Sequence, residues 1–540
     1  MPTENRSFDY IIVGAGAAGC VLANRLSASE NVSICILEAG GSDRHPWIDI
    51  PAGFVKTLYG DRFVWPFQTQ PVPSLNGRSI ALPQGKVIGG SSSINGMVYN
   101  RGQRADFDVW AQLGNTGWGF DDLLPYFNKS ENRISNSKIE HRGRNGELPI
   151  TDLDWDNPLA DAFLKAAEGA GIPRVTDYNS GFQFGAGYFQ RYILGGRRVS
   201  AAKAFLRPSL KRSSVLMQSK SQVIKLEING KKVSGVCYLD RSGKEQLVTA
   251  NREIILSAGA INTPKIMQIS GIGAPRHLNS IGVEVKHALN GVGENLRDHY
   301  SVRMTAKAKN VLTINELARW PRLPLEVLKW VTARPSILSI CPTIAFVHGK
   351  SSPSLEDADI RILFTPGSYK DGKVYVLDDF PGLTCGAAQP RPDSVGYVRA
   401  SSSNHDDPPA IQPNYLYAET DKRITLAGLR LARKILERPE LSHYYDFETL
   451  PGHDVQSDDE LLDFAMRKGN TGYHVVGTAK MGRLEDTTAV VDNQLKVHGL
   501  QGLRVIDASI MPTLPSANTF ASTIAIAEKG ADIILNNYRG

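Results

Sequence analysis

The sequence predicts an α/β protein, in which a parallel sheet with an attached β-meander is joined to a second domain of α+β type. Three stretches carry this prediction. Residues 8–26 have the pattern of a buried strand, a glycine-rich turn and a helix. Residues 215–257 alternate between strands and tight turns such as Asn229-Gly230, which is typical of a meander. Residues 305–470 contain prolines, a charged loop and strand-like runs, which indicate an antiparallel sheet carrying helices.

Length and composition exclude several classes of protein. The chain has 540 residues, for which two domains are expected, and its net charge of +6 includes no long basic run, so no nucleic-acid partner is predicted. No apolar stretch is long enough to span a membrane, which leaves peripheral membrane contact open. The five cysteines are scattered and predict neither a metal site nor a disulfide framework. The first ten residues lack the apolar core of a secretory signal, and a cytoplasmic protein is expected.

The first strand, turn and helix form a dinucleotide-binding fingerprint. Gly14 allows the tight turn, Gly16 lets the backbone approach a pyrophosphate, and Gly19 lets the helix pack close to the strand. A second strand, Val32–Leu37, ends in Glu38, at the position of the acid that binds an adenosine ribose. The alternative is a glycine-rich turn in an unrelated α/β fold.

A second cluster of glycines and serines follows at residues 85–96. Its backbone N–H groups could form a nest for an anion or an electron-rich ring. FAD is longer than one nucleotide site can hold, so this cluster after a dinucleotide fingerprint predicts a second contact with FAD. The irregular, aromatic-rich connection at 42–82 is interpreted as a cover over a ligand or a satellite apolar cluster.

The remaining elements are predicted from apolar spacing and from cap residues. The expected helices are two pieces within 106–130, then 157–171, 201–206, 259–273, 421–437 and 519–537. The expected strands are 215–218, 223–228, 233–239 and 245–248 of the meander, then 254–259 back in the parallel sheet, and 361–364, 374–377, 396–399 and 503–507.

These elements predict two discontinuous domains. The cofactor-binding domain is expected to comprise residues 1–155, 205–305 and 470–540, because signals of the parallel sheet return near Gly472. Residues 156–204 and 306–469 are expected to form the substrate-binding domain.

Two polar residues near the C-terminus are candidates for chemistry. His474 lies between two glycines, and histidine is the usual base when a proton must leave near neutral pH. A packed or surface histidine is the simpler interpretation of this residue taken alone. Asn518 precedes a predicted helix and is a candidate N-cap as well as an active-site amide.

Six ordered motifs resemble the glucose–methanol–choline (GMC) oxidoreductase family over essentially the full length. They are GAGAAG at 14–19 with Glu38, GKVIGGSSSING at 85–96, GAINTPKIMQISGIG at 259–273, GVGENLRDH at 291–299, HVVGTAKMG at 474–482 and VIDASIMP with NTFAST at 505–523. The resemblance implies a Rossmann-type FAD-binding domain and a substrate domain whose antiparallel sheet covers the reactive face of the flavin. The N-terminal third is most similar to the bacterial alcohol, sorbose and choline dehydrogenase-like branch.

The family pattern assigns roles to individual positions of this chain. It implies that His474 accepts the hydroxyl proton of an alcohol while hydride leaves for flavin N5, and that Asn518 holds the same oxygen. Val223 would meet the adenine through its backbone. The full set of implied FAD contacts is Gly14, Ala15, Gly16, Gly19, Glu38, Ala39, Gly89, Gly90, Ser91, Asn95, Gly96, Val98, Val223, Ala258, Gly259, Asp507, Ala508, Thr519 and Phe520.

Two departures from the family pattern restrict the prediction. Members that bind FAD covalently do so through a histidine where this chain has Ile94, so non-covalent FAD is predicted. Choline-oxidising members resemble one another in carrying a glutamate that faces the ammonium. The corresponding stretch here, Pro342–Phe346, has no carboxylate, so choline is disfavoured.

The predicted function is therefore FAD-dependent oxidation of an alcohol, with a primary alcohol, a polyol or a sugar alcohol as the expected substrate. The electron acceptor is expected to be oxygen, a quinone or a cytochrome. The alternative from another class is a hydroxynitrile lyase that keeps FAD for structure. A binding protein with a vestigial flavin is disfavoured because both His474 and Asn518 are present. A nicotinamide dehydrogenase would leave the second glycine cluster unexplained, and clustered metal ligands are not evident.

Overall fold

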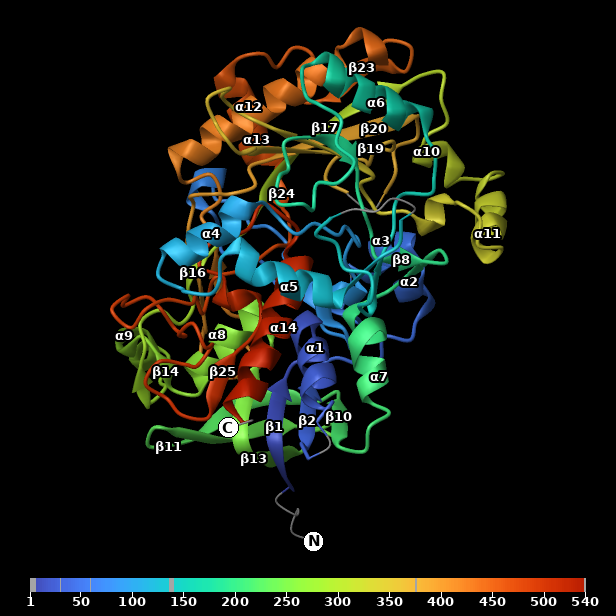
Figure 1. Cartoon of the computed structure of the whole chain (residues 1–540). Helices are drawn as coiled ribbons and strands as arrows, with labels where there is room; N and C mark the ends of the chain where they lie inside the picture. The colour runs from blue at the N-terminus through green and yellow to red at the C-terminus, as the bar shows by residue number, and fades with distance from the viewer. Residues whose placement is uncertain (1–5, 30, 59, 136–139, 374–375, 539–540) are drawn as a thin grey trace.

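Two sheets lie at opposite ends of the molecule (Figure 1). The computed structural model describes residues 6–538 except 30, 59, 136–139 and 374–375. The predicted fold class is confirmed: one sheet is mainly parallel with an attached meander, and the other is antiparallel.

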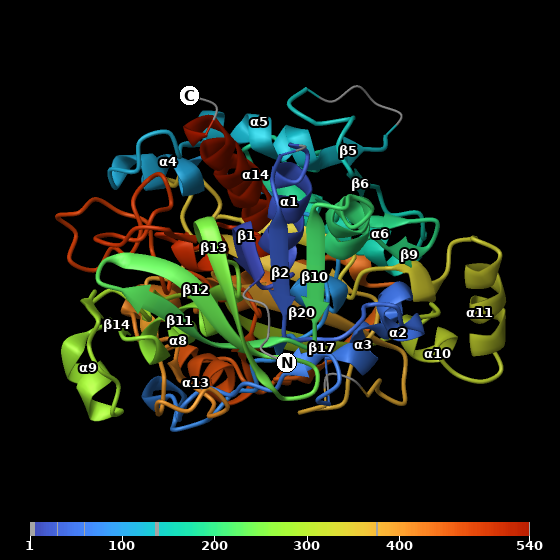
Figure 2. The same cartoon turned by 90° about the horizontal axis from the view of Figure 1, so that it is seen from below.

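The parallel sheet is built on the first strand of the chain. β1 (Arg6–Val13) pairs with β2 (Ile34–Glu38) on one side and with β13 (Glu245–Leu256) on the other, parallel in both cases. The C-terminal parts of β1 and β13 and most of β2 are apolar and buried, and α1 (Ala17–Leu26) and α14 (Thr519–Asn537) lie side by side over the sheet (Figure 1, Figure 2).

The meander is shorter than the sequence pattern predicts. β10 (Val215–Ser219), predicted as its first strand, pairs parallel with β2 and belongs to the parallel sheet. Only β11 (Gln222–Asn229), β12 (Lys232–Leu239) and β13 form the meander. The runs predicted separately at 245–248 and 254–259 are joined in one twelve-residue strand, β13. The first part of β13 pairs with β12, and its last part lies between β1 and β25 (Leu503–Val505).

The second sheet is antiparallel, in the order β23-β17-β20-β19-β18-β7, with β24 beside β17. The predicted strand at 396–399 lies instead in a small sheet with β16 and β22, and the predicted strand at 374–377 includes residues outside the described part. The strand bounds are β7 (Gly185–Tyr188), β16 (Glu294–Leu296), β17 (Tyr300–Ala308), β18 (Ala345–Gly349), β19 (Ile360–Thr365), β20 (Gly382–Ala388), β21 (Gly396–Arg399), β22 (Ala410–Gln412), β23 (Tyr445–Leu450), β24 (Asn470–Thr471) and β25 (Leu503–Val505).

The predicted helices form close to the positions that the sequence indicates, whereas α11 and α13 are helices that the sequence pattern does not predict. The predicted helix at 201–206 is a single π-helical turn, Ala202–Leu206, that continues into α7 (Arg207–Ser209). Asn157 caps α6 by accepting hydrogen bonds from the N–H groups of Leu159 and Ala160. The longer helices are α4 (Arg104–Gln112), α5 (Phe120–Ser130), α6 (Pro158–Gly169), α8 (Gly259–Ile269), α11 (Leu323–Val331), α12 (Glu419–Leu436) and α13 (Asp458–Lys468); shorter ones are α2 (Pro46–Asp49), α3 (Phe54–Thr57), α9 (Pro275–Ser280) and α10 (Ile314–Leu317).

Each sheet has its own apolar core. One core lies between the parallel sheet and the helices α1 and α14, and the other between the antiparallel sheet and the helices α6, α12 and α13. The division into a cofactor domain and a substrate domain stays a prediction. Within the described ranges, no helix combines the length and the apolar character needed to cross a membrane.

A buried ion network stabilises the first half of the chain. Glu131, at the start of β5 (Glu131–Arg133), forms ion pairs with Arg101 and Arg142, and all three side chains are fully buried. Arg142 has a second carboxylate partner, Asp177, at 2.8 Å, whereas Glu131 is the carboxylate that pairs with Arg101.

We therefore expect Glu131→Gln to lower the free energy of unfolding by about 3–5 kcal/mol, because it leaves the buried guanidinium group of Arg101 without its carboxylate partner. The control is Asp458→Asn, which breaks an exposed ion pair with Arg430 and should cost about 0–1 kcal/mol. Chemical denaturation of both variants measures the difference. Equal effects of the two substitutions would contradict the structural role of Glu131.

Candidate active site

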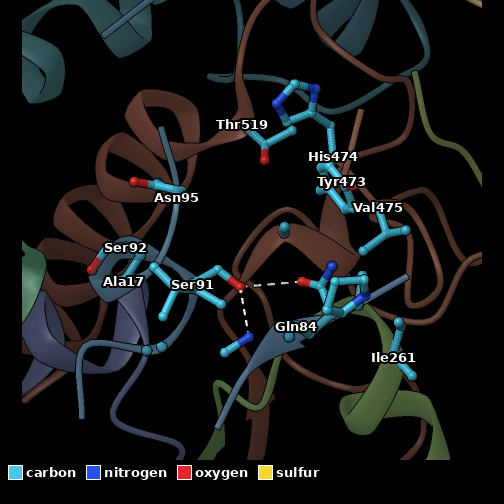
Figure 3. A pocket seen from close by; sticks show the side chains of 18 of the residues that line it. Ala17, Gln84, Ser91, Ser92, Asn95, Ile261, Tyr473, His474, Val475 and Thr519 are labelled. Atoms are coloured by element: carbon cyan, nitrogen blue, oxygen red, sulfur yellow. Dashed lines mark hydrogen bonds between the residues drawn. The ribbon is translucent and has the colours of Figure 1, made fainter. Parts of the chain in front are cut away.

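A cavity of about 440 Å³ lies between the two sheets. Its walls come from the ends of β1 and β2, from the loop after β13, and from β17, β19 and β20 of the antiparallel sheet. In Figure 3, Ala17 and Ser92 lie in the lower part of the view and His474 and Thr519 in the upper part. The cavity therefore connects the first glycine turn with the candidate catalytic histidine.

The first glycine turn has the close approaches that the fingerprint predicts. Gly14 has a φ of +100°, and a Cβ there would lie 2.5 Å from the carbonyl oxygen of Ser257. A Cβ on Gly19 would lie 2.0 Å from the carbonyl oxygen of Gly14, so the helix can pack against the strand only with glycine. Gly16 faces the cavity, and the nearest atom to a Cβ there is 3.9 Å away.

The second glycine cluster packs directly against the first. The N–H of Gly89 donates to the carbonyl oxygen of Ala15 at 2.8 Å. A Cβ on Gly90 would lie 2.8 Å from the Cα of Gly16. The two clusters, far apart in the sequence, thus form one wall of the cavity.

Two buried carboxylates hold the loops at this end. Glu38 accepts hydrogen bonds from the N–H groups of Ala15 (2.8 Å) and Gly40 (2.7 Å). Burial raises its pKa to about 7, against the lowering effect of these two hydrogen bonds. Asp507 accepts from the N–H of Gly259 and from Thr263 Oγ1, and burial raises its pKa as well.

The structure brings most of the predicted site residues to this cavity. Three do not line it: Ala15 and Gly89 are hydrogen-bonded to each other and join the two glycine clusters, and Gly19 packs against Gly14. Ile94 also lines the cavity, at the position where a tethering histidine would be required. The predicted residues that line the cavity are Gly14, Gly16, Glu38, Ala39, Gly90, Ser91, Asn95, Gly96, Val98, Val223, Ala258, Gly259, His474, Asp507, Ala508, Asn518, Thr519 and Phe520.

His474 and Asn518 are neighbours at the far end of the cavity. Asn518 Nδ2 lies 3.0 Å from His474 Nε2, and Nδ1 of His474 lies 2.8 Å from Nδ1 of His299. Nε2 of His299 lies 2.7 Å from the carbonyl oxygen of Pro390. At the other end, Arg361 Nη2 donates to Asn518 Oδ1 at 2.5 Å.

The Pro390 carbonyl and the Arg361 guanidinium, at the two ends of this series of hydrogen bonds, determine the direction of each bond in it. The Pro390 carbonyl can only accept, so His299 carries its proton on Nε2 and its Nδ1 accepts from His474 Nδ1. His474 is then left with a lone pair on Nε2. The Arg361 guanidinium can only donate, so Asn518 turns its oxygen toward Arg361 and its NH₂ group toward His474.

The same surroundings keep both histidines neutral. Burial, the neighbouring His299 and the positive charge of Arg361 lower the pKa of His474 well below its ordinary value. Burial and Arg361 lower the pKa of His299 to about 3. An unprotonated Nε2 with a lone pair is the form of histidine that can accept a proton.

Asp298 fixes the backbone at His474. It accepts a hydrogen bond from the N–H of His474 at 2.7 Å and two more from the hydroxyl groups of Tyr415 and Thr471. Burial raises its pKa to about 6 despite these bonds. Asp298 and His299 end the motif at 291–299, and the sequence pattern predicts no role for them. The sequence feature that could have indicated a role is this pair of titratable residues at the end of a loop motif.

Comparison with known proteins shows the family of this chain. The sequence profile of the GMC oxidoreductases matches residues 8–301 in its N-terminal part and residues 392–527 in its C-terminal part. The chain belongs to the GMC oxidoreductase family. This GMC oxidoreductase is 38% identical to an alcohol dehydrogenase [acceptor] of Pseudomonas putida, over 98% of the chain and 96% of that protein. It is 37% identical to an oxygen-dependent choline dehydrogenase of Photobacterium profundum, over 99% of the chain and 94% of that protein.

A solved structure supports the same assignment. An FAD-dependent oxidoreductase from Chaetomium thermophilum is 27% identical and superposes with a TM-score of 0.90, covering 98% of this chain and 100% of that one. The predicted enzyme class and the predicted cofactor, FAD, are confirmed.

The residues of the cavity fit FAD. The backbone of Gly16 faces the cavity at the N-terminus of α1, where N–H groups favour a pyrophosphate, and Glu38 lies at the end of β2 where a ribose is held. The same cavity of about 440 Å³ is lined by both Gly16 and His474, so one ligand that fills it can reach from the glycine turn to the candidate base. The individual FAD contacts stay predictions.

Two glycine substitutions separate binding from folding. Gly16→Ala places a methyl group in the cavity without a clash in the protein, so we expect weaker FAD binding and unchanged stability of the FAD-free enzyme. Gly19→Ala forces its methyl group against the backbone of Gly14 and should lower the free energy of unfolding by about 1–3 kcal/mol. FAD content and thermal unfolding of the FAD-free proteins measure both effects. The assignment of Gly16 fails if its variant binds FAD like the wild type.

Proposed function

We propose that this GMC oxidoreductase oxidises alcohols to aldehydes or ketones. One observation carries the proposal: an unprotonated His474 Nε2 lies beside the Asn518 amide in a cavity that fits FAD. The named relatives support it, since one is an alcohol dehydrogenase and another a choline dehydrogenase. A primary alcohol, a polyol or a sugar alcohol is the proposed substrate, and oxygen, a quinone or a cytochrome the proposed electron acceptor.

His474 and Asn518 have complementary roles in this reaction. A substrate hydroxyl that replaces the direct hydrogen bond between Asn518 Nδ2 and His474 Nε2 donates its proton to His474 Nε2 and accepts a hydrogen bond from Asn518 Nδ2. Removal of that proton makes the adjacent C–H bond a better hydride donor, and FAD, when bound, supplies the hydride acceptor. His299 stabilises the protonated ring by accepting from Nδ1, and Asp298 holds the ring in place through its backbone.

Further features of the proposal follow from the cavity wall. Ile94 stands where a covalent tether would need a histidine, so FAD is proposed to be non-covalent. Pro342 and Thr343 line the cavity where a glutamate would be needed to pair with an ammonium, which disfavours choline. We retain the two-domain division with boundaries near 155, 205, 305 and 470 and a cytoplasmic location as proposals.

Anaerobic mixing with a panel of aliphatic, benzylic and polyol alcohols tests the proposed reaction. Bleaching of the flavin absorbance is expected for at least one class, because hydride transfer reduces the ring. The panel is then repeated with oxygen and with an artificial dye to identify the acceptor. Absence of bleaching throughout, together with release of cyanide from a cyanohydrin, would favour a hydroxynitrile lyase instead.

Removal of the proposed base tests its role directly. We expect His474→Ala to lower kcat by about 10²–10⁴-fold and to leave FAD bound, because it removes the proton acceptor and no predicted FAD contact. The control is His443→Ala, an exposed histidine outside the cavity, which should keep wild-type turnover. Turnover of His474→Ala close to that of the control would contradict the assigned role.

The lowered pKa of His474 predicts the pH dependence of turnover. A histidine acts as a base when it is neutral, and this one stays neutral until the pH falls well below 6.5. We therefore expect kcat/KM for an alcohol to show no decline near pH 6.5 and to fall only at a lower pH. A pH profile of kcat/KM with a midpoint at the ordinary histidine pKa would contradict the assigned hydrogen-bond network.

A further inference from the structure

Arg361 is a buried cation with few partners at the substrate end of the cavity. It lies on β19, is 3% exposed and lines the cavity. Nη2 donates to Asn518 Oδ1, but Nε is buried and has no hydrogen-bond partner. Among the described residues, Arg361 forms no ion pair, and burial lowers its pKa to about 10.

Other buried arginines of this protein are compensated. Arg101 pairs with Glu131, and Arg504 pairs with Glu253. Arg198, which also lacks a carboxylate partner in the described structure, donates instead to the carbonyl oxygens of Ile48, Ser92 and Asn95. Arg361 has one neutral hydrogen-bond acceptor, and its Cζ lies 5.7 Å from the centre of the Phe189 ring, so its charge is the least compensated of these four arginines.

The charges that line the cavity are distributed unevenly. The carboxylates among its described lining residues are Glu38 and Asp507, which lie at the end of the parallel sheet and are engaged by backbone N–H groups. The wall from the antiparallel sheet contributes Arg361 and Arg303. The wall at the substrate end is therefore positively charged, and among its described lining residues it has no carboxylate that could pair with Arg361.

We propose that Arg361 binds a carboxylate of the substrate, and that the enzyme oxidises short hydroxy acids. This inference rests on the proposed alcohol oxidation. Arg361 contacts the same amide that holds the reacting hydroxyl, so a carboxylate on Arg361 lies close to the carbinol carbon. The planar guanidinium matches a carboxylate with two parallel hydrogen bonds, and its pairing removes the cost of the isolated buried charge.

The reaction leaves the carboxylate unchanged. The hydroxyl proton goes to His474, the carbinol hydrogen leaves with its electron pair to FAD, and the product is the corresponding oxo acid. A carboxylate supplies the single negative charge that the buried Arg361 guanidinium lacks, and binding of a phosphate is the competing outcome of the test. The cationic wall also disfavours an ammonium substrate such as choline, independently of the missing glutamate.

Matched pairs of substrates test the proposal. The kcat/KM of glycolate, lactate and other short hydroxy acids is compared with that of the corresponding carboxamides, which have the same shape without the charge. We expect the wild type to prefer the best acid by about tenfold to a hundredfold, the usual effect of a charge-assisted hydrogen-bond pair. Equal rates for acids and amides, or a preference for a phosphorylated alcohol, would overturn the carboxylate assignment.

Three variants separate recognition from a structural effect. Arg361→Gln keeps a donor for Asn518 but loses the charge, so the ratio of acid to amide rates should fall to about one. Arg361→Lys keeps the charge and should retain part of the preference. Arg430→Gln, on an exposed arginine far from the cavity, should keep the wild-type ratio. A ratio in Arg361→Gln equal to the wild-type ratio would show that Arg361 only orients Asn518, and would overturn the proposal.

A binding measurement distinguishes this proposal from the proposed function. Calorimetric titration of the FAD-loaded enzyme with propanoate, an unreactive carboxylate, is compared with propanamide. The Kd of propanoate should be about tenfold to a hundredfold lower for the wild type than for Arg361→Gln. The Kd of propanamide should be the same for both proteins. If alcohols fail to bleach the flavin but propanoate binding still depends on Arg361, the proposed oxidation is wrong and the proposed carboxylate site is supported. If alcohols are oxidised without any dependence on Arg361, the carboxylate site fails alone.

Discussion

One chain of hydrogen bonds determines what the active site can do. It begins at the Pro390 carbonyl, passes through His299, His474 and Asn518, and ends at Arg361. A carbonyl cannot donate and a guanidinium cannot accept, so no member of the chain can reverse its direction without leaving a buried group unpaired. The lone pair on His474 Nε2 is therefore a consequence of residues that do not themselves meet the hydroxyl group.

The chain of hydrogen bonds joins the two sheets of the molecule. Arg361 comes from the antiparallel sheet, whereas Asn518 precedes α14, which packs on the parallel sheet. The backbone of His474 is fixed by Asp298, whose other partners include Thr471 on the short strand β24 beside β17. Relative displacement of the sheets would disturb the hydrogen bonds on which the neutral state of His474 depends. The position of the base and the closure of the cavity are thus parts of the same packing arrangement.

At the opposite end, the cavity is built by backbone more than by side chains. Gly14 and Gly19 allow strand, turn and helix to touch, and Gly90 brings the second cluster against Gly16. Glu38 ties the first turn to the end of β2 by accepting from two backbone N–H groups. The FAD contacts predicted for this end are therefore mainly contacts with the backbone. The wall from the antiparallel sheet carries Arg361 and Arg303, and it is where we propose that the substrate is recognised.

The local sequence alone determined the elements whose signals lie within a few residues of each other. The strand, glycine turn and helix at 8–26 and the helix at 519–537 are examples, because sterics and hydrogen bonding along a short stretch specify them. The family resemblance added FAD and singled out His474 and Asn518, whose roles stay predictions. Only the tertiary structure decided that β10 joins the parallel sheet, since strand pairing depends on distant partners that local pattern does not reveal. It also decided that His299 and Arg361 border His474 and Asn518, because burial and proximity, not residue type, make a histidine neutral and an arginine uncompensated.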